Sequence, residues 1–495
     1  MSKVLTTGSP WRVVLAFAVP LLIGNVVQQL YQVVDAIVVG RVIGVDALAA
    51  VGATGSFLFL LLGFAWGLTN GFAIPTAQAF GAGDAAAVRR SVAAGAVLTG
   101  ATSVVLTVLA PMLAGPALRL LRTPEELVPE ATTFAVVSFL GASTMMFFNF
   151  LAAIIRAIGD SRTPLVFLAI SCLLNIGLVL AFVGSLGLGV GGAAWATVVS
   201  QGVSVALCLA YVRRRVPVLH VRREDWRVIS RADLGLHLRL GLPMGFQASI
   251  IAIGAIAVQV RLNDLGSDAV ASYTAATRVD GLAVALLASL GLAMSMFVAQ
   301  NHGAGRPDRI RQGVAQGVWI SVAGAVVLGA VLIAAGAPIV RLFVGQGEEE
   351  VVAAATTYLV VNGALYVVLG VLFVLRGALQ GLGHTFVPTL TGAVELVMRV
   401  GAAIVLGAAF GFAGVVWGNP LAWIGAVAIL IPAYLRARRR LAETPITAPV
   451  GEDVVADVLV LEGPIEGSSV VDAVIPTQMG PRDATDATPA PLARH

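Results

Sequence analysis

Long apolar stretches alternate with short polar turns along most of the chain. Twelve stretches are long enough to cross about 30 Å of hydrocarbon, which takes roughly 20 helical residues. They lie near residues 13–40, 47–75, 88–113, 130–155, 163–184, 190–212, 238–260, 272–299, 312–336, 352–380, 386–410 and 413–435. A barrel strand needs only about ten residues of alternating pattern, so runs of this length predict helices. The pattern predicts an all-α membrane protein with twelve transmembrane helices.

The last six stretches repeat the first six. The clearest shared feature is a Gln-Xaa-Xaa-Gly-Ala-Gly turn at residues 78–83, which returns 222 positions later at residues 300–305. Other landmarks keep offsets of 222 to 224 positions: Pro20 with Pro243, Gly159 with Gly383, Pro164 with Pro388, and residues 192–195 with 414–417. Each half holds an even number of stretches, so both halves enter the bilayer in the same sense, as parallel repeats do in secondary transporters. We expect two pseudo-symmetric six-helix lobes, residues 1–212 and 238–440.

The distribution of arginine predicts the orientation in the membrane. Seven arginines lie in the connection at residues 213–237, and four more end the last stretch at residues 436–440. Short cytoplasmic loops keep the excess of Lys and Arg, so both segments are predicted to be cytoplasmic. We therefore predict that the chain lies in the inner (plasma) membrane with both of its termini in the cytoplasm. The first stretch is too long for a signal-peptide core and has no small-residue cleavage pattern nearby, so we expect it to remain in the chain.

Composition supports the membrane assignment and excludes one large class of protein. With 58% hydrophobic residues, 12% charged residues and a mean hydropathy of +0.92, the apolar side chains cannot all lie inside one water-soluble core. The pI of about 9.4 follows from membrane orientation, and we expect no nucleic-acid partner. Residues 213–237 are predicted to form an amphipathic linker on the inner headgroups. Residues 441–495 suit a disordered cytoplasmic tail, to which no function is assigned.

Enzyme chemistry is not indicated anywhere in the chain. No GxSxG, HExxH, P-loop or dinucleotide-binding motif stands in a suitable context, and the histidines lack the spacing of metal ligands. Cys172 and Cys208 both lie in apolar stretches, where they are expected to be small buried hydrophobic residues. We therefore expect no enzyme activity, no metal and no cofactor, with the lipid bilayer as the chief surroundings.

Asp35 is the leading candidate for a functional site. It lies in the first apolar stretch with Tyr31 one helical turn before it, on the same face. A carboxyl group in surroundings of low dielectric binds a proton more tightly, so Asp35 could load and release a proton as a cavity opens and closes. The alternative is an acid at the outer interface that water reaches.

Other polar or kinking residues in the spans allow two interpretations each. Pro20 removes a backbone hydrogen bond in the first helix, which makes it a hinge or a static kink. Asn149, Asn175 and Thr197, in the fourth, fifth and sixth stretches, could contact a transported species or join helices by hydrogen bonds.

One pair of charges lies in the eleventh stretch. Glu395 and Arg399 are four positions apart, a spacing that places them on one helix face and lets them neutralise each other. We expect a structural ion pair rather than a coupling site, because neither charge would be free to cycle.

Together the motifs resemble a known family over residues 10–440. They comprise Val34, Asp35 and Gly40 in the first stretch, Ala-Gln-Xaa-Xaa-Gly-Ala-Gly in both halves, Arg-Ala-Ile-Gly-Asp-Ser-Arg-Thr-Pro at residues 156–164, and Gly-Xaa-Ala-Xaa-Ala-Thr ending at Thr197. The chain resembles the multidrug and toxic compound extrusion (MATE) transporters, and within them the DinF-like branch. This resemblance implies two six-helix lobes around a central cleft, a monomer, and export of small organic cations in exchange for protons or sodium ions.

The resemblance also implies roles for individual residues. Asp35 matches the acid of the amino-terminal lobe that is implicated in cation coupling, with Tyr31, Asn175 and Thr197 as hydrogen-bond neighbours and Pro20 at the bend of the first helix. One departure concerns the coupling ion. Where many members have Leu-Asn-Xaa-Xaa-Leu-Asp in the fifth span, this chain has Val179 in place of the second acid. The seventh and tenth spans also lack the acids of the sodium-coupled NorM-like branch.

These departures favour proton coupling through Asp35 over sodium coupling, which remains the first alternative. A second alternative is a lipid-linked saccharide flippase, because relatives of that kind share the two-lobe plan. Such proteins line the cavity with cationic residues for a pyrophosphate group. The spans of the amino-terminal half carry no ring of arginines at membrane depth, which argues against a flippase.

Overall fold

A computed structural model describes residues 5–120, 123–344 and 348–443, and every regular element within these ranges is helical. Most of the predicted tail lies outside the described residues. The amino half, α1 to α7, consists of α1 (Pro10–Val42), α2 (Val45–Gly81), α3 (Ala85–Leu120), α4 (Val128–Leu140), α5 (Ala142–Ala157), α6 (Arg162–Val179) with the π-helical turn η1 (Leu180–Ser185), and α7 (Gly189–Arg215).

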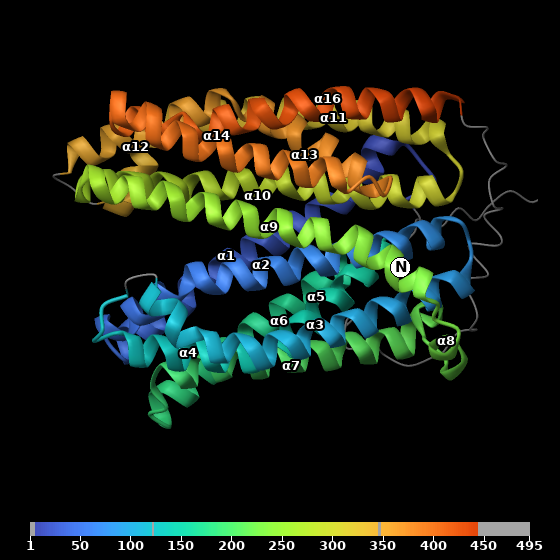
Figure 1. The fold of residues 1–495 in the computed structure, drawn as a ribbon, viewed down its shortest axis with the longest axis horizontal. Helices are drawn as coiled ribbons and strands as arrows, with labels where there is room; N and C mark the ends of the chain where they lie inside the picture. Colours follow the sequence, from blue (N-terminus) through green and yellow to red (C-terminus); the bar gives the residue numbers. More distant parts are fainter. Residues whose placement is uncertain (1–4, 121–122, 345–347, 444–495) are drawn as a thin grey trace, which may run out of the picture. The chain divides into compact units, whose positions relative to one another are not determined.

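The carboxy half, α9 to α16, repeats this order. It consists of α9 (Arg231–Leu265), α10 (Ser267–Gly303), α11 (Pro307–Val344), α12 (Glu349–Ala364), α13 (Tyr366–Gly381), α14 (Phe386–Phe410), α15 (Phe412–Val416) and α16 (Gly418–Glu443). Ser230 caps α9, because its hydroxyl accepts from the amide of Asp233 over 3.1 Å while the Asp233 carboxylate accepts from the Ser230 amide over 2.9 Å. Figure 1 shows α10 to α16 above and α3 to α7 below.

The twelve predicted spans are confirmed once two bent pairs of helices are each counted as one span. Ten helices in the described part of the chain are long and apolar enough to cross a membrane. The pairs α4–α5 and α12–α13 bend by 48° and 52°, at Gly141 and Leu365, which are 224 positions apart. The bend in the fourth span therefore has its counterpart in the tenth, and the repeat extends from sequence to helix geometry.

The residues predicted as a linker contain several short elements. Residues 213–237 comprise the end of α7, a 3-10 turn η2 (Pro217–Leu219), α8 (Arg223–Arg227) and the first turns of α9. Val218 and Leu219 are buried in the core of the amino half. Asp225 of α8 forms an ion pair with Arg89 of α3 over 3.3 Å. The linker therefore packs against the amino half, near the start of α3.

The most extensive contact between the two halves runs along α2 and α9. A Cβ atom at Gly71 would lie 2.5 Å from the Gly241 Cα atom, and one at Gly67 would overlap the Met244 carbonyl. Further along α2, a Cβ at Gly63 would reach only the Ala248 Cβ at 4.0 Å, and one at Gly55 would have no described neighbour within 4 Å. Helices α2 and α9 therefore touch at Gly71 and Gly67 and as far as Leu60, whose carbonyl oxygen accepts from the Ser249 hydroxyl over 3.2 Å, and the contact is lost towards Gly55.

The two Gln-Xaa-Xaa-Gly-Ala-Gly turns lie against each other where α2 and α10 end, and we call this the closed end of the bundle. A Cβ at Gly81 would overlap the Gln300 carbonyl, and a Cβ at Gly303 would overlap the Gln78 carbonyl. The last glycine of the first turn, Gly83, has a φ of 72°, in the left-handed region that favours glycine. The motif is thus explained by close backbone approach at its first glycine and by turn geometry at its last.

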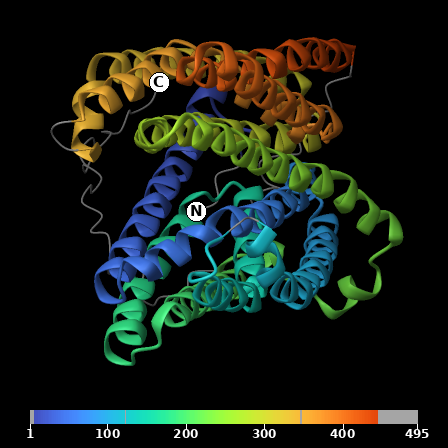
Figure 2. The same cartoon turned by 60° about the vertical axis from the view of Figure 1, so that its left-hand side comes forward.

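Helix α1 packs against both halves. Its early residues Val14, Phe17 and Ala18 belong to the apolar core of the carboxy half, whereas Val39 packs with α6 and α7 of the amino half. Pro20 lies between these two parts. Figure 2 shows α1, in dark blue, running between the two groups of helices.

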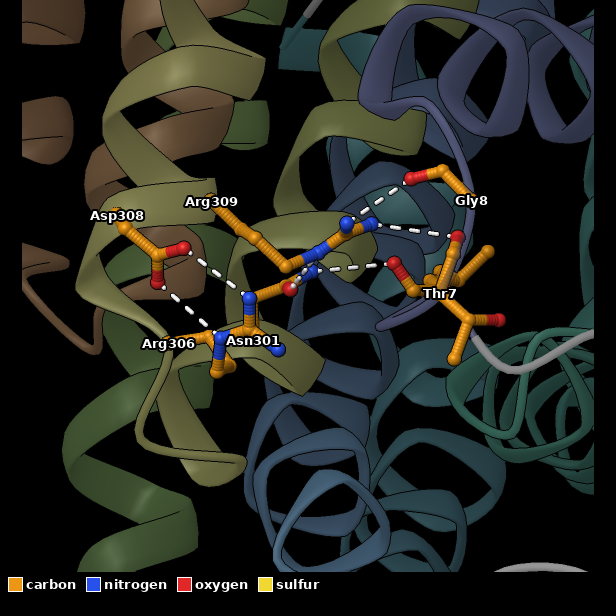
Figure 3. A network of polar contacts seen from close by, with 7 residues as sticks. Thr7, Gly8, Asn301, Arg306, Asp308 and Arg309 are labelled. Atoms are coloured by element: carbon orange, nitrogen blue, oxygen red, sulfur yellow. Dashed lines mark hydrogen bonds and ion pairs between the residues drawn. The ribbon is translucent and has the colours of Figure 1, made fainter. Parts of the chain in front are cut away.

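The segment before α1 is held by the carboxy half. The Arg309 guanidinium donates to the Thr7 and Gly8 carbonyl oxygens over 3.2 and 2.9 Å, and to the Asn301 side chain over 3.0 Å (Figure 3). The Leu5 amide donates to the Gln300 side chain over 2.9 Å. Residues 5–8 therefore lie at the closed end, beside the second of the two turns.

Candidate functional site

Three of the predicted site residues form one hydrogen-bonded chain in the amino half. The Tyr31 hydroxyl of α1 lies 3.0 Å from the Thr197 hydroxyl oxygen of α7, and the Asn175 side chain of α6 donates to the same oxygen over 3.2 Å. Thr197 donates to the Ala193 carbonyl, one turn earlier in α7, over 3.3 Å. Its proton is therefore directed to the backbone, which leaves its oxygen to accept from Tyr31 and Asn175.

Asp35 lies one turn after Tyr31 in α1 and interacts with it electrostatically. Its Oδ1 atom is buried and has no hydrogen-bond partner among the described residues, and the same is true of the Asn175 Oδ1 atom. A buried acceptor without a donor is costly, and such atoms are rare in folded proteins. Two of them near the same hydroxyl groups give the site unused capacity to hold a proton or a small cation.

An apolar cluster lies one helical turn beyond Asp35 in α1 and one turn beyond Asn175 in α6. Val39 of α1 packs with Val179, Val183 and Val190, which line the facing surfaces of α6, η1 and α7. These side chains keep the local dielectric low, so a negative charge on Asp35 is poorly solvated there. The arrangement strengthens any interaction between the carboxylate and a cation that reaches it.

Two other predicted residues lie elsewhere. Asn149 donates to the Met145 carbonyl of its own helix α5 over 3.0 Å, and no hydrogen bond of the described residues joins it to Tyr31, Thr197 or Asn175. Pro20 lies inside α1 with unbroken helix on both sides. Just after it, the Asn25 side chain donates to the Ser289 hydroxyl of α10 over 2.9 Å, which bridges the halves.

The predicted ion pair between Glu395 and Arg399 is wrong. Glu395 of α14 pairs with Arg376 of α13, and both side chains are buried. Arg399 donates instead to the Asn419 side chain of α16 over 2.9 Å. A partner on a neighbouring helix meets Glu395 in the interior, whereas Arg399, one turn further along α14, faces α16. The helical spacing was compatible with a pair, but tertiary packing supplied another partner.

A second acidic centre, which the sequence interpretation missed, lies in the carboxy half. Asp280 of α10 is 7% exposed and accepts from the Tyr366 and Tyr358 hydroxyls over 2.5 and 3.2 Å. These tyrosines lie on opposite sides of the bend at Leu365, so one carboxylate holds both arms of the bent span. The signal was present, because Asp280 stands within the eighth apolar stretch, where an acid is unusual.

No group of three or more His, Cys, Asp or Glu side chains capable of holding a metal ion occurs within the described residues. Asp35 and Asp280 are on different halves; Asp280 accepts from two tyrosine hydroxyls and interacts electrostatically with Arg399, whereas Asp35 interacts electrostatically with Tyr31. Within the described ranges each centre thus contains a single acid.

Comparisons with known proteins agree with this architecture. The family model MatE matches residues 20–183 and 243–405, one segment in each half. The chain is 31% identical over 387 residues to the Probable multidrug resistance protein YoeA of Bacillus subtilis, covering 77% of this chain and 83% of that protein. It is also 28% identical over 288 residues to the DNA damage-inducible protein F of Escherichia coli, covering 56% of this chain and 62% of that protein.

The fold matches solved structures as well. The crystal structure of MATE in complex with MaL6 superposes with a TM-score of 0.82 at 23% identity, covering 90% of this chain and 99% of that one. At this identity the likeness concerns the fold, and it agrees with twelve spans in two halves. With the family model matching two thirds of its length and a relative above 30% identity, the chain belongs to the MatE family of membrane transporters.

Proposed function

We propose that this protein is an efflux antiporter that exports small organic cations in exchange for protons, with Asp35 as the group that carries the proton. The observation behind the proposal is the Oδ1 atom of Asp35, which is buried beside the Tyr31–Thr197–Asn175 chain and has no hydrogen-bond partner among the residues that the structure describes. A proton would neutralise a charge that its apolar neighbours solvate poorly.

The position of Asp35 on α1 supports coupling between proton binding and the movement of the halves. Asp35 lies on the part of α1 that packs with the amino half, while the part before Pro20 packs with the carboxy half. A change in charge at Asp35 would alter the packing of the second part against α6 and α7. Because the first part is held by α10 and α11, the strain would be carried to the contact between the halves.

The predicted topology sets the direction of the cycle. If the closed end lies at the cytoplasm, as the arginines predict, then the conformation described here faces outward. A proton from outside would bind Asp35, substrate would leave, and the halves would rock to face inward. There the proton would dissociate and an organic cation would bind. We propose this cycle for a monomer in the plasma membrane with both termini in the cytoplasm.

Sodium is the alternative coupling ion. Asp35, Asn175, Thr197 and Tyr31 carry oxygen atoms of the kind that hard cations prefer. However, Val179 stands where a second acid would add charge, and a single carboxylate is weaker support for sodium than for a proton.

A lipid-linked saccharide flippase is a less suitable alternative. Arg376 is a buried arginine within a span of the carboxy half, and the Glu395 carboxylate neutralises it. A compensated charge is a poor ligand for a pyrophosphate group. The pairing of Arg376 with Glu395 therefore favours efflux of organic cations over a flippase function.

The test uses the full chain reconstituted in liposomes with a fluorescent organic cation. We expect a pH gradient to drive transport, a sodium gradient to have no effect, and Asp35→Asn to abolish transport. Asp84→Asn is the matched control, because it removes the same negative charge at an exposed turn. Asp84 accepts a hydrogen bond from the Ala87 amide at the start of α3, outside the proposed site. Transport driven by sodium would overturn the coupling ion, and full activity of Asp35→Asn would overturn the role of Asp35.

A further inference from the structure

A groove lies between the first turns of α11 and the last turns of α16 in the carboxy half. It has a volume of about 300 Å3 and is lined by two arginines, two aromatic residues and three small apolar residues. Arg311 lies near the start of α11 and Arg438 near the end of α16, at the end of the bundle where the halves meet. Trp319 and Tyr434 lie on the same two helices. The groove therefore combines positive charge with an aromatic and apolar wall.

No described acidic side chain neutralises the positive charge in the groove. Neither Arg311 nor Arg438 forms an ion pair within the described ranges, and no lining residue is acidic. The Arg311 Nε atom is buried and has no hydrogen-bond partner in the described part of the chain. Both guanidinium groups interact electrostatically with Tyr434, so they converge on one place. Two convergent guanidinium groups are well suited to bind phosphate oxygens.

The wall of the groove changes from charged to apolar along α11. Trp319 lies two turns after Arg311 and is 74% exposed, whereas Val314 between them is buried. An exposed tryptophan beside a buried tyrosine at the end of a span is typical of the zone where headgroups meet acyl chains. A ligand that fits has an anionic group at one end and an apolar body at the other.

The amino half has an arginine at the position that matches Arg311, and an acidic side chain pairs with it. Arg89 of α3 lies 222 positions before Arg311, and it pairs with Asp225 of the linker over 3.3 Å. Linker residues Val218 and Leu219 are buried in the same apolar cluster as Val88, the neighbour of Arg89 in α3. At the position matching Trp319, α3 has Val97. The repeat thus places an arginine at both sites, and in the amino half a protein acid and apolar side chains cover it.

We propose that the groove between α11 and α16 binds the headgroup of an anionic phospholipid. The phosphate accepts hydrogen bonds from Arg311 and Arg438, as the Asp225 carboxylate pairs with Arg89 in the other half, and the acyl chains lie along Trp319. The bound lipid joins α11 to α16 at the end where the halves meet. This inference does not depend on the coupling ion or on the transported substrate.

The test is a lipid titration of the full-length protein in detergent, followed by native mass spectrometry. Phosphatidylglycerol is compared with phosphatidylcholine, on the wild type, on Arg311→Gln/Arg438→Gln, and on Arg436→Gln/Arg439→Gln. The last variant is the matched control, because it removes two exposed arginines from the same end of α16 outside the groove. We expect the groove variant to bind phosphatidylglycerol about 10-fold or more weakly and the control to match the wild type.

A second variant separates the groove from an effect on folding. Trp319→Ala keeps both arginines and changes an exposed side chain, so we expect a normal elution profile and several-fold weaker binding of phosphatidylglycerol. Equal losses in the groove and control variants would overturn the proposal, and so would equal binding of phosphatidylcholine. If inorganic phosphate at millimolar concentration displaces phosphatidylglycerol, the groove is a site for free phosphate, and the proposal of a phospholipid ligand is overturned.

The acidic segment after α16 is the competing occupant. Residues 444–495 contain Asp and Glu and follow α16 directly. We expect a chain ending at Glu443 to bind phosphatidylglycerol as the full chain does. If the shortened chain gains binding that the full chain lacks, the segment itself occupies the groove and the lipid proposal fails.

Discussion

Gln300, at the end of α10, donates a hydrogen bond from Nε2 to the carbonyl oxygen of Ala157, at the end of α5, over 2.7 Å. Its counterpart Gln78, at the end of α2, donates to the Gly381 carbonyl at the end of α13 over 3.0 Å. Ala157 and Gly381 are 224 positions apart, so the two bonds are related by the repeat. Each bond joins one half to the other, beside the glycines at which the backbones touch. Each copy of the turn motif therefore donates one hydrogen bond to the opposite half, and the two bonds together hold this end of the bundle closed.

Removal of both glutamine side chains should open this end more often. Buried hydrogen bonds between membrane helices contribute about 0.6 to 1.7 kcal/mol each, so Gln78→Ala/Gln300→Ala should raise the open population about 10-fold. Spin labels at Ala86 and Gln312, after replacement of Cys172 and Cys208, would report the separation of the halves as a distance distribution. Gln259→Ala is the control, because Gln259 bonds within its own helix. An unchanged distribution in the double variant would contradict the role of these bonds.

The glycines at the same contact should tolerate no side chain. A Cβ atom at Gly303 would overlap the Gln78 carbonyl, so Gly303→Ala should hold the halves apart and reduce transport at least 10-fold. Gly55→Ala, where no described atom lies within 4 Å of the added carbon, is the matched control and should transport normally. Dye transport in liposomes measures both. Equal activity of the two variants would show that the close approach is not needed for the cycle.

The pairing of Glu395 can be measured with a double-mutant cycle. Breaking a buried pair leaves a charge uncompensated, which costs about 3 to 5 kcal/mol, so Arg376→Gln should destabilise the protein strongly. Unfolding in detergent mixtures gives the coupling free energies. We expect a large coupling between Glu395 and Arg376 and a small one between Glu395 and Arg399. The reverse order would restore the pair that helical spacing predicts.

Asp280 should stabilise the bent span through its two tyrosines. Tyr366→Phe removes a hydrogen bond to a carboxylate, and we expect the free energy of unfolding to fall by about 1.5 to 3 kcal/mol. Tyr273→Phe is the matched control, because the Tyr273 ring packs on Tyr358 while its hydroxyl makes no hydrogen bond among the described residues. Its effect should be below about 0.5 kcal/mol. If both variants unfold alike, the ring alone accounts for the stability.

Much of the architecture follows from the sequence alone, because a bilayer imposes a length and a repeat imposes a symmetry. Twelve apolar stretches predict twelve spans, since every backbone polar group in hydrocarbon must be bonded within its own helix. The offset between Gln78 and Gln300 predicts two related halves. Asp35 and Tyr31 stand out for the same reason, because an ionisable group inside an apolar run is costly and needs a partner or a purpose.

Partners between helices depend on packing that periodicity does not specify. Glu395 could have paired with Arg399 by spacing, yet the interior places Arg376 beside it. The contact of Gln300 with Ala157 joins residues 143 positions apart, and no local pattern encodes a contact at that range. The sequence by itself determined which segments cross the membrane and which polar groups they carry. Only the tertiary structure decided which of these groups meet, because helices of equal hydrophobicity can rotate and slide until their small residues and hydrogen bonds fit.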